Sequence, residues 1–382
     1  MTAQVITSAN LFNNKLQTNS KFVLLKNLNS PIMINVSLLK EICELPGVPG
    51  HEQKVRELIQ RELKNIADDI SIDHMGNLIA VKKGKSSAKK VMAAAHMDEI
   101  GFIVHHIDEN GFLRFHPLGG FDPKTLTAQR VIVHGKKDVI GVMGTKPIHL
   151  MTAEERIKPL HLTDFFIDLG MPRKEVVKIV EVGSTVTRER ELIEMGECVN
   201  CKSIDNRVAV FILIETLREL KGKSIPYDFY GIFTVQEEVG IRGAQVAAHH
   251  IGAEFSFCID TTIAFDTPGA KPEESVTKLG DGVAIKIMDS SAICDYRMVK
   301  YMKELADKNK IKWQPELLPA GGTDTAGMQR MAPNGTIAGA VSIPTRHIHS
   351  VIEMAHKADI KGNIDLLKLC LTNLDKYDWS FK

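Results

Sequence analysis

Hydrophobic positions first become regular over residues 36–66. Apolar side chains recur there every three or four residues, which is the spacing of one face of a helix. In the second half of the segment they are Val55, Leu58, Ile59, Leu63 and Ile66. The glycines and prolines of residues 46–50 interrupt the pattern, because both residue types break a continuous helix. We therefore predict a helical segment that is broken at residues 46–50.

Two strand-like segments follow, NLIAVKKG (77–84) and KVMAAAHMDEIGFIV (90–104). The second opens with an unbroken apolar run, as expected for a strand covered on both faces of an α/β sheet. After residue 187, helices and strands alternate again. These segments are an amphipathic helix (205–220), a strand (227–235), a helix (242–251) and a strand (254–260). The alternation predicts an α/β fold with a doubly wound mixed sheet.

Residues 101–187 have a different pattern, in which short β-rich segments alternate with turns. They include GFLRFHPLGGF, QRVIVHG, DVIGVMG and VVKIVEVGSTVT. This pattern predicts a small, barrel-like β domain inserted into the α/β chain. We therefore expect one α/β domain over residues 35–100 and 188–382, interrupted by the insertion.

The first residues of the chain form a separate segment. Residues 1–40 contain no Asp or Glu, and the longest apolar run near the start is FVLL (22–25). That run is too short for a secretory signal. A transit peptide usually carries arginines, and this segment has none. We expect a leader or a disordered tail over residues 1–34.

Composition narrows the class of protein. The chain has 382 residues and a formal net charge of +1, so no strong field predicts binding to nucleic acid or to an anionic membrane. No apolar run approaches the roughly 18 residues of a membrane span.

Six cysteines are too few for a disulfide scaffold in a chain of this length, which favours a reducing, cytoplasmic location. Cys198 and Cys201 form a CxxC that can signal redox chemistry or zinc. We interpret them as structural, because no second CxxC follows.

Acids and histidines close several of the predicted strands. They are His96, Asp98, Glu237, Glu238, Asp260, His347 and His349, and Asp205 opens the helix at 205–220. The carboxyl ends of strands in a doubly wound sheet line a ligand crevice. Several carboxylates in one crevice repel one another and raise each other's pKa unless cations neutralise them.

This set of side chains suits divalent metal ions. Histidine nitrogens and carboxylate oxygens bind zinc at roughly 2.0–2.2 Å, and this many carboxylates suits two ions, roughly 3.5–4 Å apart, better than one. Asp98 lies two residues beyond His96 and can accept a hydrogen bond from its other ring nitrogen. Neighbouring side chains on an extended backbone point to opposite sides. One of Glu237 and Glu238 can therefore reach a metal, while the other acts as a general base on metal-bound water.

Structural alternatives exist for most of these residues. His96 alone fits a buried histidine, and Asp205 fits a helix N-cap. Glu237 and Glu238 can pair with Arg242, four or five residues further on. A separate alternative for Asp260 is a cap on the turn that follows it.

Nine motifs, in order, closely resemble the M42 metallopeptidases, the group of tetrahedral and glutamyl aminopeptidases. They are LPGVPGHE, AHMDEIGFIV, KPIHLMTAEER, FIDLG, SIDNRVAV, TVQEEVGIRGA, DTPG, GGTD and PTRHIHS. The resemblance covers residues 38–382. It implies an aminopeptidase that hydrolyses N-terminal peptide bonds with two metal ions per subunit, zinc first, with cobalt or manganese as alternatives.

The resemblance also implies a role for each site residue. His96 and Asp260 would bind one ion, Glu238 and His349 the other, Asp205 would bridge them, Glu237 would be the general base, and Asp98 the orienting acid. It places GGTD beside the substrate, so we expect Gly322, Thr323 and Asp324 to line the pocket, although the segment also fits a simple turn. His347 stands where the family usually has an aromatic residue, and we expect it to face solvent or lie behind the ligands.

The inserted domain would be a dimerisation module, with dimers assembling into a tetrahedral dodecamer. Two alternative functions remain. One is a metal-dependent deacylase or other amidohydrolase on the same fold, and the other is an inactive peptide-binding scaffold. The presence of Glu237 and every expected ligand disfavours the scaffold. A typical glycosidase uses two carboxylates without a metal pair, so the histidines disfavour a glucanase.

Overall fold

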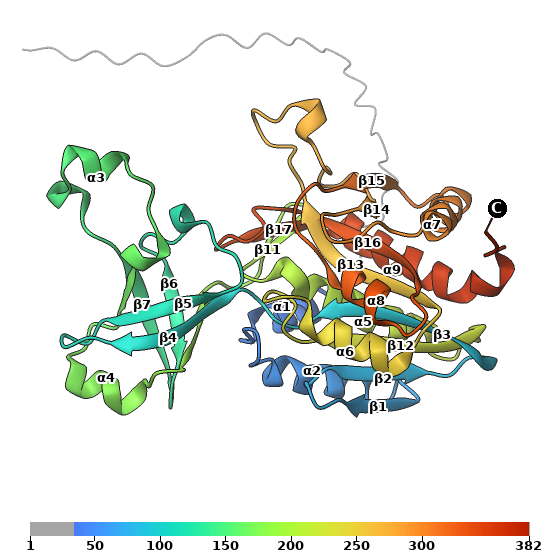
Figure 1. Cartoon of the computed structure of the whole chain (residues 1–382), viewed down its shortest axis with the longest axis horizontal. Helices are drawn as coiled ribbons and strands as arrows, with labels where there is room; N and C mark the ends of the chain where they lie inside the picture. The colour runs from blue at the N-terminus through green and yellow to red at the C-terminus, as the bar shows by residue number, and fades with distance from the viewer. Residues whose placement is uncertain (1–33, 382) are drawn as a thin grey trace, which may run out of the picture. The chain divides into compact units, whose positions relative to one another are not determined.

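A large mixed sheet and a closed barrel make up the computed structural model, which describes residues 34–381. Within these residues, eleven strands belong to the sheet and six antiparallel strands close the barrel (Figure 1). The predicted α/β class and the predicted barrel are thus confirmed. Residues 1–33, which hold nearly all of the predicted leader, lie outside the described residues.

The sheet places four parallel strands at its centre. In order, its main path contains β1 (Asp69–Ile72), β2 (Leu78–Lys82), β12 (Tyr227–Thr234), β3 (Ser86–His96), β13 (Phe255–Ile263), β16 (Ile337–Arg346), β17 (Glu353–His356), β11 (Cys198–Cys201) and β10 (Ile193–Met195). Off this path, β14 (Val283–Met288) pairs with β16, and β15 (Trp313–Leu317) pairs with β14. Strands β12, β3, β13 and β16 are mutually parallel. Their carboxyl ends therefore meet at one edge, where polar residues gather.

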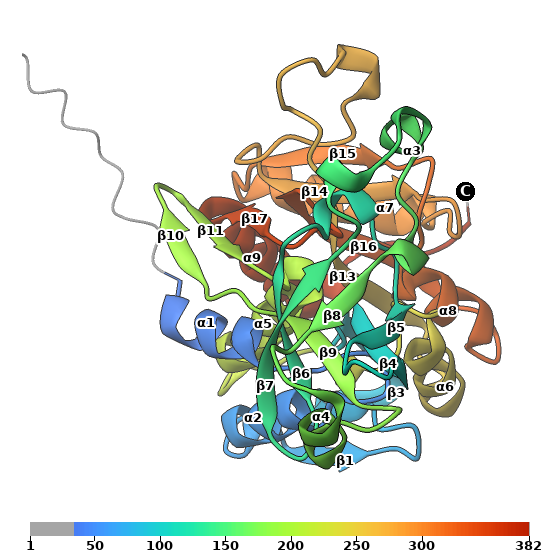
Figure 2. The same ribbon diagram turned by 90° about the vertical axis from the view of Figure 1, so that its left-hand side faces the viewer.

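Helices cover both faces of the sheet (Figure 2). One face carries α5 (Ile204–Leu220) with α1 (Val36–Glu44), α2 (Gln53–Leu63) and α9 (Lys357–Asn373). The other carries α6 (Arg242–Ile251) and α8 (Asp324–Met331), while α7 (Tyr296–Lys308) packs on β14, β16 and α9. The predicted helices at 36–66, 205–220 and 242–251 are confirmed.

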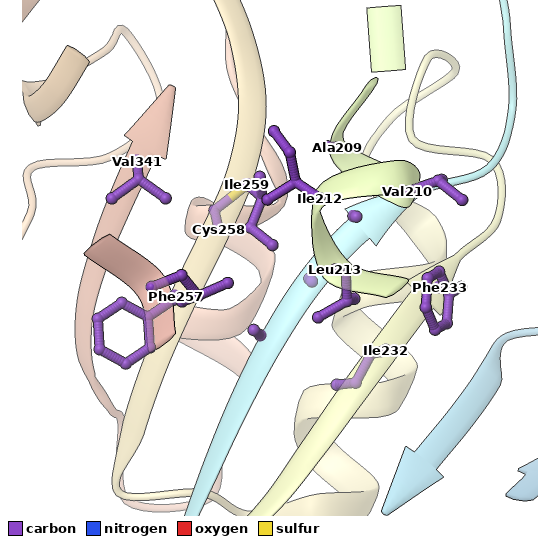
Figure 3. Close-up of a cluster of buried hydrophobic side chains, with 14 of the residues drawn as sticks. Ala209, Val210, Ile212, Leu213, Ile232, Phe233, Phe257, Cys258, Ile259 and Val341 are labelled. Carbon is purple, nitrogen blue, oxygen red and sulfur yellow. The ribbon is translucent and has the colours of Figure 1, made fainter. Parts of the chain in front are cut away.

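Helix α5 forms the centre of the core. Ile212 and Leu213 of this helix lie over the central strands, beside Phe233 of β12 and Ile259 of β13 (Figure 3). The expectation of an amphipathic helix is wrong here, because α5 is buried on nearly all sides. Neighbouring helices α1, α2 and α9 cover the side that would otherwise face water.

The barrel has its own hydrophobic core. Its strands, in order, are β4 (Gly101–Ile107), β5 (Leu113–Leu118), β8 (Phe166–Asp168), β7 (Asp138–Gly144), β6 (Arg130–His134) and β9 (Thr185–Arg188). Phe102, Val131 and Phe165 are among the side chains buried inside it. Two short helices, α3 (Ala153–Ile157) and α4 (Arg173–Ile179), flank the strands. The division into an α/β domain and an inserted domain stays a prediction.

Two predicted strands differ from the structure. The segment 90–104 splits into β3 and β4 because the chain leaves the sheet after His96 and enters the barrel at Gly101. Gly101 passes so close to Val48 that a Cβ would lie 2.3 Å from its Cγ1. VVKIVEVGSTVT contains the end of α4, and only its last residues are β9. Val176 of α4 packs into the barrel core, and so does Val180, the extended residue that follows the helix.

No helix among residues 34–381 has the length and apolar character that crossing a membrane requires.

Candidate active site

A cavity of about 470 Å³ opens at the carboxyl ends of the central strands. Its lining includes His96, Asp205, Glu237, Glu238, Asp260 and His349. These residues come from the end of β3, the start of α5, the turn after β12, strand β13 and the turn after β16. The structure thus brings together six of the seven residues that the sequence analysis assigns to metal binding or catalysis.

A first group of possible ligands consists of His96, Asp205 and Asp260, whose nearest ligand atoms all lie within 4.8 Å of one another. His96 Nε2 lies 3.4 Å from Asp205 Oδ1 and 3.7 Å from Asp260 Oδ1. All three side chains are buried. Strand β13 continues to Ile263, so Asp260 belongs to the strand and does not end it.

The second group consists of Asp205, Glu238 and His349. His349 Nε2 lies 3.2 Å from Asp205 Oδ2 and 3.5 Å from Glu238 Oε2. The two oxygens of Asp205 therefore face different groups. Ser203 occupies the N-cap position of α5. The carboxylate oxygens of Asp205 face His96 and His349 in the cavity rather than the first N–H groups of the helix, which argues against the capping alternative.

The two glutamates follow β12 in a turn that Asp98 holds. The carboxylate of Asp98 accepts hydrogen bonds from the backbone N–H of Glu237 (3.1 Å) and of Glu238 (3.0 Å). His96 Nδ1 lies 3.1 Å from the backbone carbonyl oxygen of Asp98 and 3.5 Å from its Oδ1. Asp98 thus contacts the histidine as expected, but its carboxylate also fixes the glutamate turn. Arg242 Nη1 donates a hydrogen bond to Gln236 Oε1, so its guanidinium points to Gln236, the residue before the two glutamates.

Glu237 stands apart from both possible ligand groups. Its Oε2 lies 3.9 Å from His96 Nε2. Burial, opposed by nearby His96, raises the pKa of Glu237 well above its usual range, with a further contribution from Asp260. A raised pKa makes this carboxylate a stronger proton acceptor, as a general base requires.

The charges of the site fit divalent cations. Burial and repulsion from Asp205 raise the pKa of Glu238 to about 7, and burial also raises the pKa of Asp260 well above its usual range. Glu238 Oε1 is buried and makes no hydrogen bond. Such groups are costly unless a cation accompanies them. Two imidazoles and three carboxylates are also a donor set that zinc and similar ions accept.

Glu353 is a residue that the sequence analysis missed. Its Oε2 accepts a hydrogen bond from Asp205 N (2.8 Å), and its Oε1 accepts one from His349 N (3.1 Å). Arg188 Nη1, at the end of barrel strand β9, lies 3.7 Å from the same Oε1. Glu353 and Arg188 are both fully buried. The available signal was an acid inside the apolar run VIEMA, which requires a buried partner.

The remaining predicted residues lie at the edge of the site. Gly322 and Thr323 line the cavity, whereas Asp324 is buried behind it and accepts a hydrogen bond from Thr234. His347 is exposed to solvent and belongs to neither ligand group. All six cysteines lie among the described residues and are free, including Cys198 and Cys201.

Comparisons with known proteins place the chain in a family. A family profile described as M42 glutamyl aminopeptidase matches residues 76–366. A putative aminopeptidase of Acetivibrio thermocellus is 40% identical over 86% of this chain and 96% of its own length. Among solved structures, an aminopeptidase of Desulfurococcus kamchatkensis is 35% identical over 88% of this chain and 94% of its own, with a TM-score of 0.85.

A third relative is the TET1 peptidase of Pyrococcus horikoshii, which is described as assembling into a tetrahedron or a large octahedral shell. It is 31% identical over 88% of this chain and 98% of its own, with a TM-score of 0.79. The likeness extends over 94–98% of the length of each of these relatives. The chain therefore belongs to the M42 family of aminopeptidases, enzymes that hydrolyse peptides.

Proposed function

We propose that this enzyme removes N-terminal residues from peptides with two divalent metal ions. His96 and Asp260 would hold one ion, Glu238 and His349 the other, and Asp205 would bridge them. The observation that carries the proposal is the pair of ligand groups that share Asp205, one oxygen facing each. Nitrogen and oxygen donors favour zinc, with cobalt or manganese as alternatives.

Glu237 is proposed as the general base. When bound, two such ions lower the pKa of a water molecule and polarise the scissile carbonyl group. Glu237 Oε2 would take the proton of that water and deliver it to the leaving amine. Its position outside both ligand groups leaves the carboxylate available, and Asp98 supports it by holding the backbone of the turn. The free α-amine of the substrate would lie near the acidic side chains, which favours cleavage at the peptide's end.

Hydrolysis of aminoacyl chromogenic substrates tests the proposal. We expect a chelator to abolish turnover and added zinc, cobalt or manganese to restore it. Glu237→Gln should bind metal normally and lose turnover by about 10²- to 10⁴-fold, the usual contribution of a general base. Glu238→Gln should instead weaken metal binding. Hydrolysis that survives chelation would exclude the metal mechanism, and a fully active Glu237→Gln variant that binds metal would exclude the base.

We further propose that the barrel mediates self-assembly, up to a tetrahedral dodecamer. The TET1 relative supports this proposal through its assemblies. In this chain, Ile148, Leu150 and Ile157 are 60%, 70% and 84% exposed around α3. Clustered exposed apolar side chains commonly mark interfaces between proteins.

A further inference from the structure

The wall of the cavity beside the charged site carries no charged side chain. It consists of Ile241, Ile263, Leu318, Ile348 and the small residues at 261–262 and 320–323. The acidic and basic groups of the lining are those already assigned to metal binding and catalysis. Any substrate side chain that enters this part of the cavity therefore meets neutral surface.

Two of the three threonine hydroxyl groups of this wall are engaged behind it, and the third, Thr261 Oγ1, is buried without a hydrogen-bond partner. Thr262 Oγ1 donates to Glu316 Oε1 (2.8 Å), and Thr323 Oγ1 donates to Asp289 Oδ2 (3.1 Å). Both acceptors are buried. Because two of the hydroxyl groups bond to buried acceptors and the third is itself buried, they add little polarity to the cavity.

A lysine lies close behind the wall but is not available to a ligand. Lys286 is fully buried, and its Nζ lies 2.8 Å from Glu316 Oε1 and 3.2 Å from Asp289 Oδ2. Two carboxylates thus compensate one ammonium group. An acidic substrate side chain would find no free cation here, and a basic one would find no acid among the residues that line this wall.

Ile241 is fixed in the wall by an unusual backbone. Its φ of 59° and ψ of 34° lie in the left-handed region, which β-branched residues rarely adopt. A Cβ on Gly327 of α8 would come 2.9 Å from Ile241 Cγ2, so the glycine allows this close packing. Ile241 N also donates to the backbone oxygen of Glu237 (2.8 Å). An apolar side chain is therefore held beside the proposed general base.

We propose that this wall binds the side chain of the substrate's N-terminal residue and selects uncharged, apolar residues such as leucine or methionine. The inference rests on the proposed function. A glutamate or lysine side chain would lose its hydration without gaining an opposite charge, which is costly. This enzyme would thus differ from the glutamyl specificity in the description of its family.

Four substrates test the inference with the metal-loaded, full-length enzyme: the p-nitroanilides of leucine, methionine, glutamate and lysine. We expect kcat/KM for leucine and methionine to exceed the values for glutamate and lysine by at least about tenfold. Equal or higher values for glutamate or lysine would overturn the inference alone. If the enzyme hydrolysed none of the four substrates, the proposed function would be overturned, and this inference with it.

A substitution in the wall supplies an independent test. Leu318→Lys places a cation in the cavity and should raise the glutamate-to-leucine ratio of kcat/KM by about tenfold or more. Leu317→Lys is the matched control, because Leu317 is 51% exposed and does not line the cavity. The control should keep the wild-type ratio, with thermal unfolding showing that both variants fold. An unchanged ratio in a folded Leu318→Lys variant would overturn the assignment of this wall to the substrate side chain.

Discussion

Glu353 joins two possible metal ligands through their backbones, since its carboxylate accepts the N–H of Asp205 at 2.8 Å and that of His349 at 3.1 Å. Neither hydrogen bond uses a ligand atom. Glu353 therefore fixes the backbone positions of Asp205 and His349 and leaves their side chains free. Groups that hold ligands in this way commonly tune metal affinity.

Glu353→Gln should weaken metal binding about 10- to 100-fold. The amide has one acceptor for two backbone donors, and it removes one of the two carboxylates near Arg188. Metal affinity can be measured by competition with a chromogenic chelator. Glu191→Gln is a suitable control, because that side chain is 84% exposed. Equal affinities in the two variants would contradict this role for Glu353.

Asp98→Asn should lower kcat about 10- to 100-fold, because the amide cannot accept both N–H groups of the glutamate turn. Steady-state kinetics at saturating metal measure the loss. Asp73→Asn is a control of the same chemistry, since Asp73 also accepts backbone N–H groups, from Met75, Gly76 and Asn77, outside the cavity. Similar kcat values for the two variants would show that Asp98 does not orient the base.

Metal removal should destabilise the folded enzyme. Ions that bind only the folded state add about 2.7 kcal/mol per site when the free ion is about 100-fold above its Kd. We expect differential scanning fluorimetry to show a lower melting temperature after chelation and its recovery with added ion. His349→Ala should recover less, whereas exposed His249→Ala should behave like wild type. A melting temperature insensitive to chelation would count against tightly bound ions.

Asp359 should make stability depend on pH. It is buried and accepts the N–H groups of Gly280 (2.7 Å) and Gly282 (2.9 Å), and burial raises its pKa to about 6. The folded state therefore binds a proton more tightly than the unfolded chain, whose value is about 3.9. This stabilisation is present below about pH 4 and is lost as the pH rises through about 6.

The comparison with Asp359→Asn isolates this contribution. The wild type should lose about 2–3 kcal/mol relative to the variant between about pH 4 and pH 6.5. Urea unfolding at several pH values measures the difference. Exposed Glu273→Gln should show no such trend. A difference between wild type and Asp359→Asn that stays constant over this range would refute the assignment.

Self-assembly should depend on the apolar residues around α3. The wild-type enzyme is expected to exceed the 42.4 kDa of one chain several-fold in mass photometry. Leu150→Lys combined with Ile157→Lys should shift it to smaller species, because charges on both positions oppose burial. Ile72→Lys, on β1 of the large sheet, should not. Wild-type enzyme that is monomeric at micromolar concentration would exclude the assembly.

It was predictable from the sequence that the site residues lie close together, because charged side chains at the ends of buried strands need partners. His96 follows an apolar run, and parallel strands bring their ends to one edge whatever the loops do. The motif resemblance then separated Glu237 from Glu238, which the residues alone left open. The structure shows that the surroundings of the two glutamates differ, because only Glu238 belongs to a ligand group.

Backbone hydrogen bonds were the part that sequence could not reveal. Asp98 and Glu353 act on N–H groups that every residue carries, so no residue pattern marks the contact. Asp205 and Glu353 are also 148 positions apart, and only the fold brings them together. Helix α4 was missed for a related reason. Its valines favour strands locally, but the helix buries Val176 in the barrel core and leaves most of its other residues outside that core.

Arg188 connects the barrel electrostatically to buried acids beside the site. It is the last residue of the barrel's final strand, yet its guanidinium lies 3.6 Å from Glu99 and 3.7 Å from Glu353, both buried beside the site. Cutting out residues 101–188 would remove a cation from beneath the ligands and leave two carboxylates facing less positive charge. The barrel is therefore not a detachable module, and any graft or exchange of it must carry an arginine at its exit.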